Sequence, residues 1–93
     1  MLTNKAIEDF KESSLEEKRD IIFLYFNAYK RAKSKNYPLA FRRLESANSL
    51  WGNSELTIIF NELLADYKLV EFEKRIEEVL EHLISILSPS IVS

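Results

Sequence analysis

The sequence predicts an all-α protein, a small bundle of four to five helices, and three observations support this fold class. Glycine occurs once and proline twice in 93 residues, so few positions can break a long helix. Apolar residues recur every three or four positions along most of the chain, which is the period of an amphipathic helix. The apolar fraction of 46 % is typical of a globular chain, and 93 residues suffice for one domain, residues 1–93.

The first two helices are expected at residues 5–12 and 15–34. Asn4 can cap the first helix, and Ser14 followed by Glu17 fits the capping-box pattern at the start of the second. The apolar stripe of the second helix is expected to consist of Leu15, Ile22, Tyr25, Phe26, Tyr29 and Ala32.

Residues 21–26 are all apolar, so on a helix their side chains point in every direction. One interpretation is a central helix that is surrounded by its neighbours. The other is that one side packs inward while Ile21, Phe23 and Leu24 contribute to a dimer or partner interface, because large exposed apolar patches are rarely unused.

Pro38 suits the first turn of a third helix, and Gly52 suits its end, because glycine tolerates a left-handed backbone. One face of this helix would carry Ala40, Leu44, Ala47 and Trp51, flanked by Phe41 and Leu50. Asn53 or Ser54 can cap a fourth helix. The apolar face of the fourth helix would consist of Leu56, Ile59, Phe60, Leu63, Leu64 and Tyr67.

The C-terminal segment carries a heptad seam, whose residues step by 3, 4, 3, 4, 3: Leu69, Phe72, Ile76, Val79, Leu83 and Ile86. The seam predicts a long C-terminal helix and a second candidate interface. It is rotated relative to the apolar face of residues 56–67. Either the helix breaks near residues 66–69, which we favour, or a single helix of about 50 Å shows two faces to two neighbours. Residues 88–93 are expected to be frayed.

The spacing of Tyr37, Ala40, Leu44, Ala47 and Leu50 resembles the second helix of one tetratricopeptide repeat, with leucine in place of the usual aromatic residue. Leu24 and Ala28 match the large and small residues of its first helix, so the resemblance covers residues 21–54. Asn27, Arg31 and Gly52 depart from the pattern, and no second repeat follows. The resemblance implies an antiparallel helical hairpin and no specific function.

The chain offers few groups for catalysis. It has no cysteine and one histidine, His82, and its single glycine cannot form a glycine-rich phosphate loop. We predict no catalytic, cofactor or metal site. Arg75 and His82, two helical turns apart, resemble the Arg-x4–6-His signature of HEPN-type ribonucleases, which dimerise to join two such motifs. Ile76 stands where those motifs carry a polar residue.

The net charge of −2 conceals a basic segment. Residues 21–44 contain no acid and six basic residues: Lys30, Arg31, Lys33, Lys35, Arg42 and Arg43. One interpretation is that these charges complement the dipole of the second helix and steer a partner. Because Tyr29, Tyr37 and Phe41 are interleaved with them, a contact with nucleic acid is the alternative.

These observations favour a non-enzymatic helical protein–protein interaction module, an adaptor, inhibitor or immunity-type protein that self-associates as a homodimer. A nucleic-acid-binding accessory protein is the main alternative, and a HEPN-like ribonuclease is a lesser one. The longest apolar run, residues 21–26, is too short to cross a membrane. The N-terminus lacks the pattern of a signal peptide, so a cytoplasmic location is expected.

Overall fold

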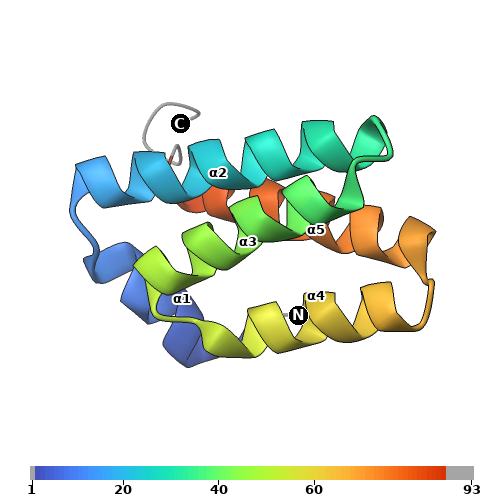
Figure 1. The fold of residues 1–93 in the computed structure, drawn as a ribbon. Helices are drawn as coiled ribbons and strands as arrows, with labels where there is room; N and C mark the ends of the chain where they lie inside the picture. Colours follow the sequence, from blue (N-terminus) through green and yellow to red (C-terminus); the bar gives the residue numbers. More distant parts are fainter. Residues whose placement is uncertain (1, 88–93) are drawn as a thin grey trace.

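The computed structural model describes residues 2–87, and the regular secondary structure of this part is entirely helical (Figure 1). The five helices are α1 (Asn4–Glu12), α2 (Leu15–Lys33), α3 (Tyr37–Trp51), α4 (Ser54–Ala65) and α5 (Leu69–Leu87). The prediction of an all-α bundle of four to five helices is confirmed. The fraying that we expected at residues 88–93 lies outside the described residues.

Helix α2 lies at one edge of the bundle and packs against α3 and α5, both of which run antiparallel to it (Figure 1). The α2–α3 pair is the predicted antiparallel hairpin. Helix α4 packs on α3 and α5 at the opposite edge, and the short α1 lies across the end where α2 begins.

Of the first two expected helix starts, one is confirmed and one is corrected. The capping box of α2 is confirmed, since Glu17 N–H donates to Ser14 Oγ and Ser14 N–H donates to Glu17 Oε1, both at 3.1 Å. Helix α1 is capped by Thr3 rather than Asn4, because Thr3 Oγ1 accepts the Ala6 N–H at 3.1 Å. Asn is the more common N-cap residue of the two, so the residue preference alone selects the wrong position here.

The N-cap of α4 is occupied by Asn53, whose side chain makes no capping hydrogen bond. The backbone N–H of Asn53 caps the C-terminal end of α3 instead, since it donates to the carbonyl of Asn48 at 2.9 Å. The position of this cap was predicted, but the hydrogen bond usually formed there is absent.

Three helices end in the same left-handed turn. The left-handed residue is Lys35 after α2, Gly52 after α3 and Tyr67 after α4, with φ of 66°, 79° and 56°. In each turn the next residue donates its N–H to the carbonyl five positions back, at 2.9 Å, which is the Schellman motif. The break expected near residues 66–69 is therefore confirmed, although the left-handed residue there is a tyrosine.

The buried face of α2 differs from the predicted stripe. It consists of Ile21, Tyr25, Ala28 and Ala32, whereas Leu15 and Phe26 are about half exposed and Ile22 and Tyr29 are partly buried. The stripe is rotated because the small side chains of α2 face inward, where helices approach closely. Ala40 and Ala47 of α3 are also fully buried.

A chain of six aromatic rings runs through the core and joins all five helices. Consecutive ring centroids are 5.5 to 6.3 Å apart and the rings are tilted or edge-on, the geometry that aromatic pairs prefer. The order is Phe10, Trp51, Tyr25, Phe60, Phe72 and Tyr37.

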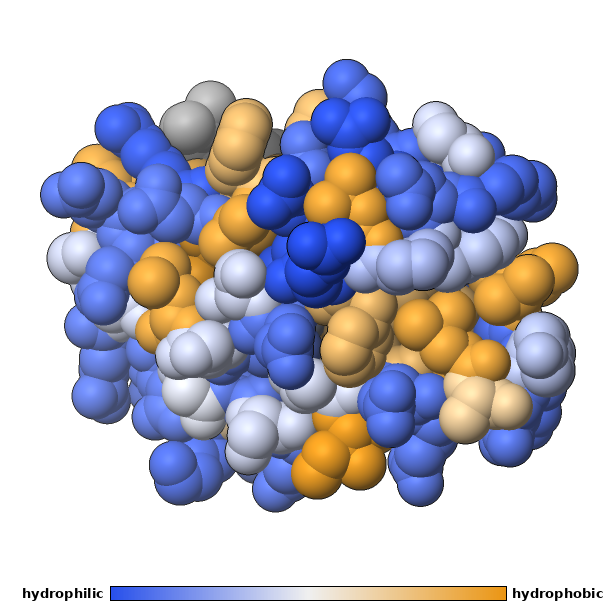
Figure 2. Space-filling model, in the orientation of Figure 1, coloured by the Kyte–Doolittle hydropathy of each residue, from blue (hydrophilic) through white to orange (hydrophobic). Residues whose placement is uncertain are grey.

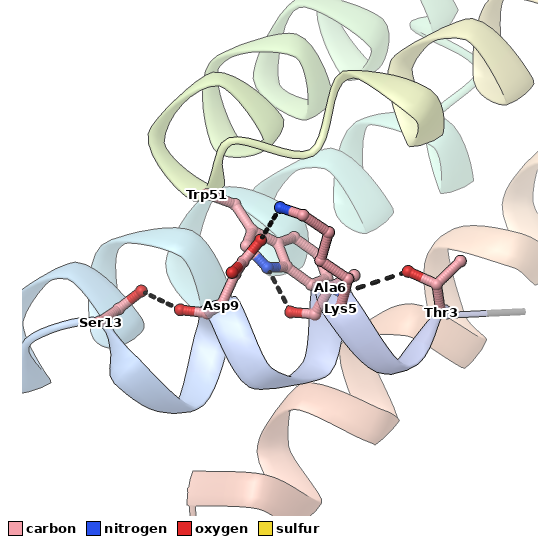
Figure 3. Close-up of polar contacts among 6 residues, drawn as sticks. All are labelled: Thr3, Lys5, Ala6, Asp9, Ser13 and Trp51. Atoms are coloured by element: carbon pink, nitrogen blue, oxygen red, sulfur yellow. Dashed lines mark hydrogen bonds and ion pairs between the residues drawn. The ribbon is translucent and has the colours of Figure 1, made fainter.

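Two sets of buried polar contacts fix the helices relative to one another. Asn48 of α3 accepts a short hydrogen bond from the Tyr25 hydroxyl and donates to Thr57 Oγ1 at 3.1 Å, which links α2, α3 and α4. Trp51 Nε1 donates to the Ala6 carbonyl at 2.9 Å and holds α1 (Figure 3). Burial raises the pKa of the Tyr25 phenol, and the hydrogen bond to Asn48 opposes this only in part.

Candidate functional site

Three large apolar side chains remain exposed on α2. Leu15, Phe23 and Phe26 are 54 %, 65 % and 48 % exposed. Phe23 and Phe26 belong to a stripe of exposed residues that step by 3, 4, 3, 4 and so share one side of the helix: Glu16, Arg19, Phe23, Phe26 and Lys30. We call this stripe the α2 outer face.

The fold explains why this face stays open. Helix α2 packs mainly against α3 and α5, and no described helix lies along its outer side (Figure 1). Lys30 Nζ lies 5.6 Å from the centre of the Phe26 ring, within the range of a cation–π contact. The other part of the Phe26 ring remains available to a partner.

The sequence predicted only part of this surface. Phe23 is exposed as the interface interpretation required, but Ile21 is fully buried and Leu24 is partly buried against the core. Phe26 was expected in the core. The 3–4 spacing of Glu16, Arg19, Phe23, Phe26 and Lys30 could have revealed the stripe, but the continuous apolar run of residues 21–26 hides its position around the helix.

The heptad seam lies inside the bundle. Four of its residues are buried in the shared core, namely Phe72, Ile76, Val79 and Leu83, and the outer two, Leu69 and Ile86, are partly buried. This corrects the interpretation of the seam as an exposed self-association surface. A chain of this size needs its most regular apolar stripe for its own core.

A second apolar surface lies on α4. A shallow groove of about 390 Å³ is lined by the apolar Ile59, Leu63 and Ala65 and by the carboxylates of Glu62 and Asp66. No Lys or Arg occurs between residues 44 and 67, so this side of the molecule is acidic. Figure 2 shows a hydrophobic area on the side where α3, α4 and α5 meet.

Two residues of the basic segment are held by other side chains. Lys33 Nζ lies 2.8 Å from Glu73 Oε1 of α5 and 5.4 Å from the centre of the Tyr29 ring. The hydrogen bond to Glu73, and secondarily the contact with Tyr29, raises the pKa of Lys33. Arg43 Nε donates to Asn27 Oδ1 at 3.2 Å.

Three other basic residues, Arg31, Lys35 and Arg42, are exposed and form no ion pair within residues 2–87. Acidic residues of α5 lie beside this end of α2, since Tyr29 OH donates to Glu77 Oε2 at 3.3 Å. The positive charge that is concentrated in the sequence is thus partly balanced in the fold.

Arg75 and His82 line one shallow groove of about 340 Å³, together with Leu2, Glu78 and Val79. Arg75 Nε lies 3.9 Å from Glu78 Oε1, so the guanidinium already has an acidic neighbour. Ile76, which replaces the polar residue of the HEPN-type motif, is fully buried.

Comparison with protein-family models, with curated proteins and with solved structures finds no match to this chain. Among the described residues no helix is long and apolar enough to cross a membrane. Residues 2–87 also bring no three carboxylate or histidine side chains together as a metal ion would require.

Proposed function

We propose that this protein is a non-enzymatic protein–protein interaction module of the adaptor, inhibitor or immunity type. The observation that carries the proposal is apolar surface flanked by charge on two helices whose other sides lie in the core: Phe23 and Phe26 of α2 are exposed, and the partly buried Ile59 and Leu63 of α4 line an open groove. A surface of this composition loses unfavourable contact with water when a partner covers it.

The groove on α4 fits a partner segment that is both apolar and basic. Ile59 and Leu63 offer the apolar floor, and Glu62 and Asp66 offer two carboxylates at the rim. Complementary charges of this kind select partners and accelerate association.

The test is capture of partners from the native host by the tagged full chain. Glu62→Lys with Asp66→Lys reverses the rim charge, and because both residues are exposed near the C-terminal end of α4, added lysines suit the helix dipole and leave the fold intact. Glu81→Lys, a charge reversal on the exposed side of α5, is the control. A partner retained by the wild type and the control and lost by the double variant supports the proposal. Equal retention by all three would exclude the groove, and capture of no partner by any of them would contradict the module function.

The second candidate function is nucleic-acid binding, favoured by the unpaired charges of Arg31, Lys35 and Arg42. If all three contacted phosphates of a duplex, the logarithm of the binding constant would fall with that of the salt concentration with a slope of about −3. Alanine at the three positions should abolish this dependence. Absence of oligonucleotide binding by the wild type at low salt would reject this function.

The ribonuclease alternative has one supporting observation, the shared groove of Arg75 and His82. RNA cleavage that persists undiminished in His82→Ala would dispose of it.

A further inference from the structure

The α2 outer face has an ordered distribution of charge along its length. Glu16 occupies its N-terminal end, with Asp20 beside it, and Lys30 occupies its C-terminal end. The exposed rings of Phe23 and Phe26 lie between these ends. Along the face the order is therefore an acid (Glu16), a base (Arg19), two aromatic rings (Phe23 and Phe26) and a base (Lys30).

This order is self-complementary under a two-fold rotation. Phe23 is seven residues from Glu16 and seven from Lys30, about 10 Å in each direction along the helix. We propose that the α2 outer face binds the same face of a second copy of this chain, with the two α2 helices antiparallel around a two-fold axis at Phe23. Each Glu16 then lies opposite Lys30 of the second copy, and the two Phe23 rings meet on the axis.

Arg19 lies between Glu16 and the two rings, and the same arrangement accommodates it. It lies four residues before Phe23, whereas Phe26 lies three residues after it. The rotation brings Arg19 of one copy beside the Phe26 ring of the other. That ring already accepts a cation on one side, at 5.6 Å from Lys30, and a guanidinium stacks well on the remaining side.

Other occupants fit the face less well. A parallel pair would place Glu16 beside Glu16 and Lys30 beside Lys30, and like charges in contact are unfavourable. A nucleic acid would be repelled by Glu16 and Asp20. One pair of helices of about 28 Å forms an interface at the small end of the specific range, the class of weak and transient complexes, so the test covers a wide range of concentrations.

Sedimentation of the purified full chain tests the dimer. Between about 5 µM and about 500 µM the wild type should shift from monomer to dimer. Phe23→Asp should remain a monomer throughout and keep its helical circular dichroism, because Phe23 is not part of the core. Val70→Asp, at an exposed apolar position of α5, is the control and should dimerise like the wild type. A wild type that sediments as a monomer at the highest concentration, or a Phe23→Asp variant that dimerises, overturns the proposal.

Charge reversal tests the antiparallel arrangement. Glu16→Lys alone and Lys30→Glu alone each place like charges at both ends of the interface, so the dissociation constant should rise about tenfold in each. An equimolar mixture of the two variants restores both opposite-charge pairs and should form heterodimers at the wild-type concentration. If the mixture associates no better than either variant alone, the antiparallel arrangement is wrong. The α4 groove is a separate surface, so a monomeric wild type that still captures its partner would leave the proposed function standing.

Discussion

Substitutions at the three left-handed turns should change the free energy of unfolding in opposite directions: adding a side chain at Gly52 should lower it, and removing the side chain of Lys35 or Tyr67 should raise it. At Gly52 an added Cβ would meet no atom within 4 Å, so only the backbone conformation opposes a side chain there. A left-handed conformation costs an ordinary residue about 1–2 kcal/mol, and replacing glycine recovers about 0.5–1 kcal/mol of chain entropy. Gly52→Ala should therefore lower the free energy of unfolding by about 1 kcal/mol.

The same reasoning predicts stabilisation at the two other turns. Lys35 and Tyr67 have left-handed backbones, and Tyr67 is 85 % exposed, so little buried area is lost when its side chain is removed. Lys35→Gly and Tyr67→Gly should each raise the free energy of unfolding by about 0.5–1 kcal/mol. The turns are far apart in sequence and share no hydrogen bond, so the two gains should add.

Urea denaturation followed by circular dichroism measures these differences. With a slope of about 1 kcal/mol per molar urea, the midpoint of Gly52→Ala should fall by about 1 M and those of the two glycine variants should rise by about half as much or more. Ser46→Gly, at an exposed position inside α3, is the control and should lower the midpoint, because that backbone is already right-handed. An unchanged midpoint for Gly52→Ala, or lower midpoints for both Lys35→Gly and Tyr67→Gly, would refute the reasoning.

Three further predictions concern the polar contacts of the core. Asn48→Ala leaves the buried Tyr25 hydroxyl without its partner and should cost about 2–3 kcal/mol of unfolding free energy in urea, part of which Tyr25→Phe should recover in the double variant. Trp51→Phe removes the donor to the Ala6 carbonyl and should cost about 1–3 kcal/mol in the same assay. Burial raises the pKa of Tyr25 in the folded state, so the folded protein keeps the phenol protonated. The unfolded chain releases this proton above a pH of about 10, the ordinary pKa of tyrosine. Stability is thus retained below that pH and lost as the pH rises, and the raised pKa of Lys33 acts in the same direction. A tyrosinate absorbance titration should accordingly show one of the four tyrosines ionising only on alkaline unfolding.

The features that could be predicted are those that depend on residues close together in the sequence. The capping box at Ser14 and the left-handed end at Gly52 follow from local hydrogen bonds and backbone freedom, and both were confirmed. The break at Tyr67 was inferred from the rotation between two apolar faces, because no glycine or proline marks it.

Features that depend on contacts between helices could not be predicted from the sequence. The rotation of α2 is decided by Ala28 and Ala32, which the run of six apolar residues obscures. Asn48 looks like a surface residue in the sequence. Its amide can be buried because Tyr25 and Thr57, which are distant in sequence, supply its hydrogen-bond partners. Ile59 and Leu63 of the α4 groove were predicted on the apolar face of this helix, but only the fold leaves them partly exposed beside Glu62 and Asp66.

Helix α1 should open separately from the rest of the native structure. This helix has nine residues and buries only Ala6 and Phe10. Trp51 contacts both of them, through a ring contact with Phe10 and a hydrogen bond to the Ala6 carbonyl. So small a contact area makes the opening free energy of α1 much lower than that of the whole molecule. Native-state hydrogen exchange should show the α1 amides exchanging as a separate cooperative unit, well before those of α2 and α5. The fluorescence of Trp51, the single tryptophan, would report this subglobal opening as an event distinct from global unfolding.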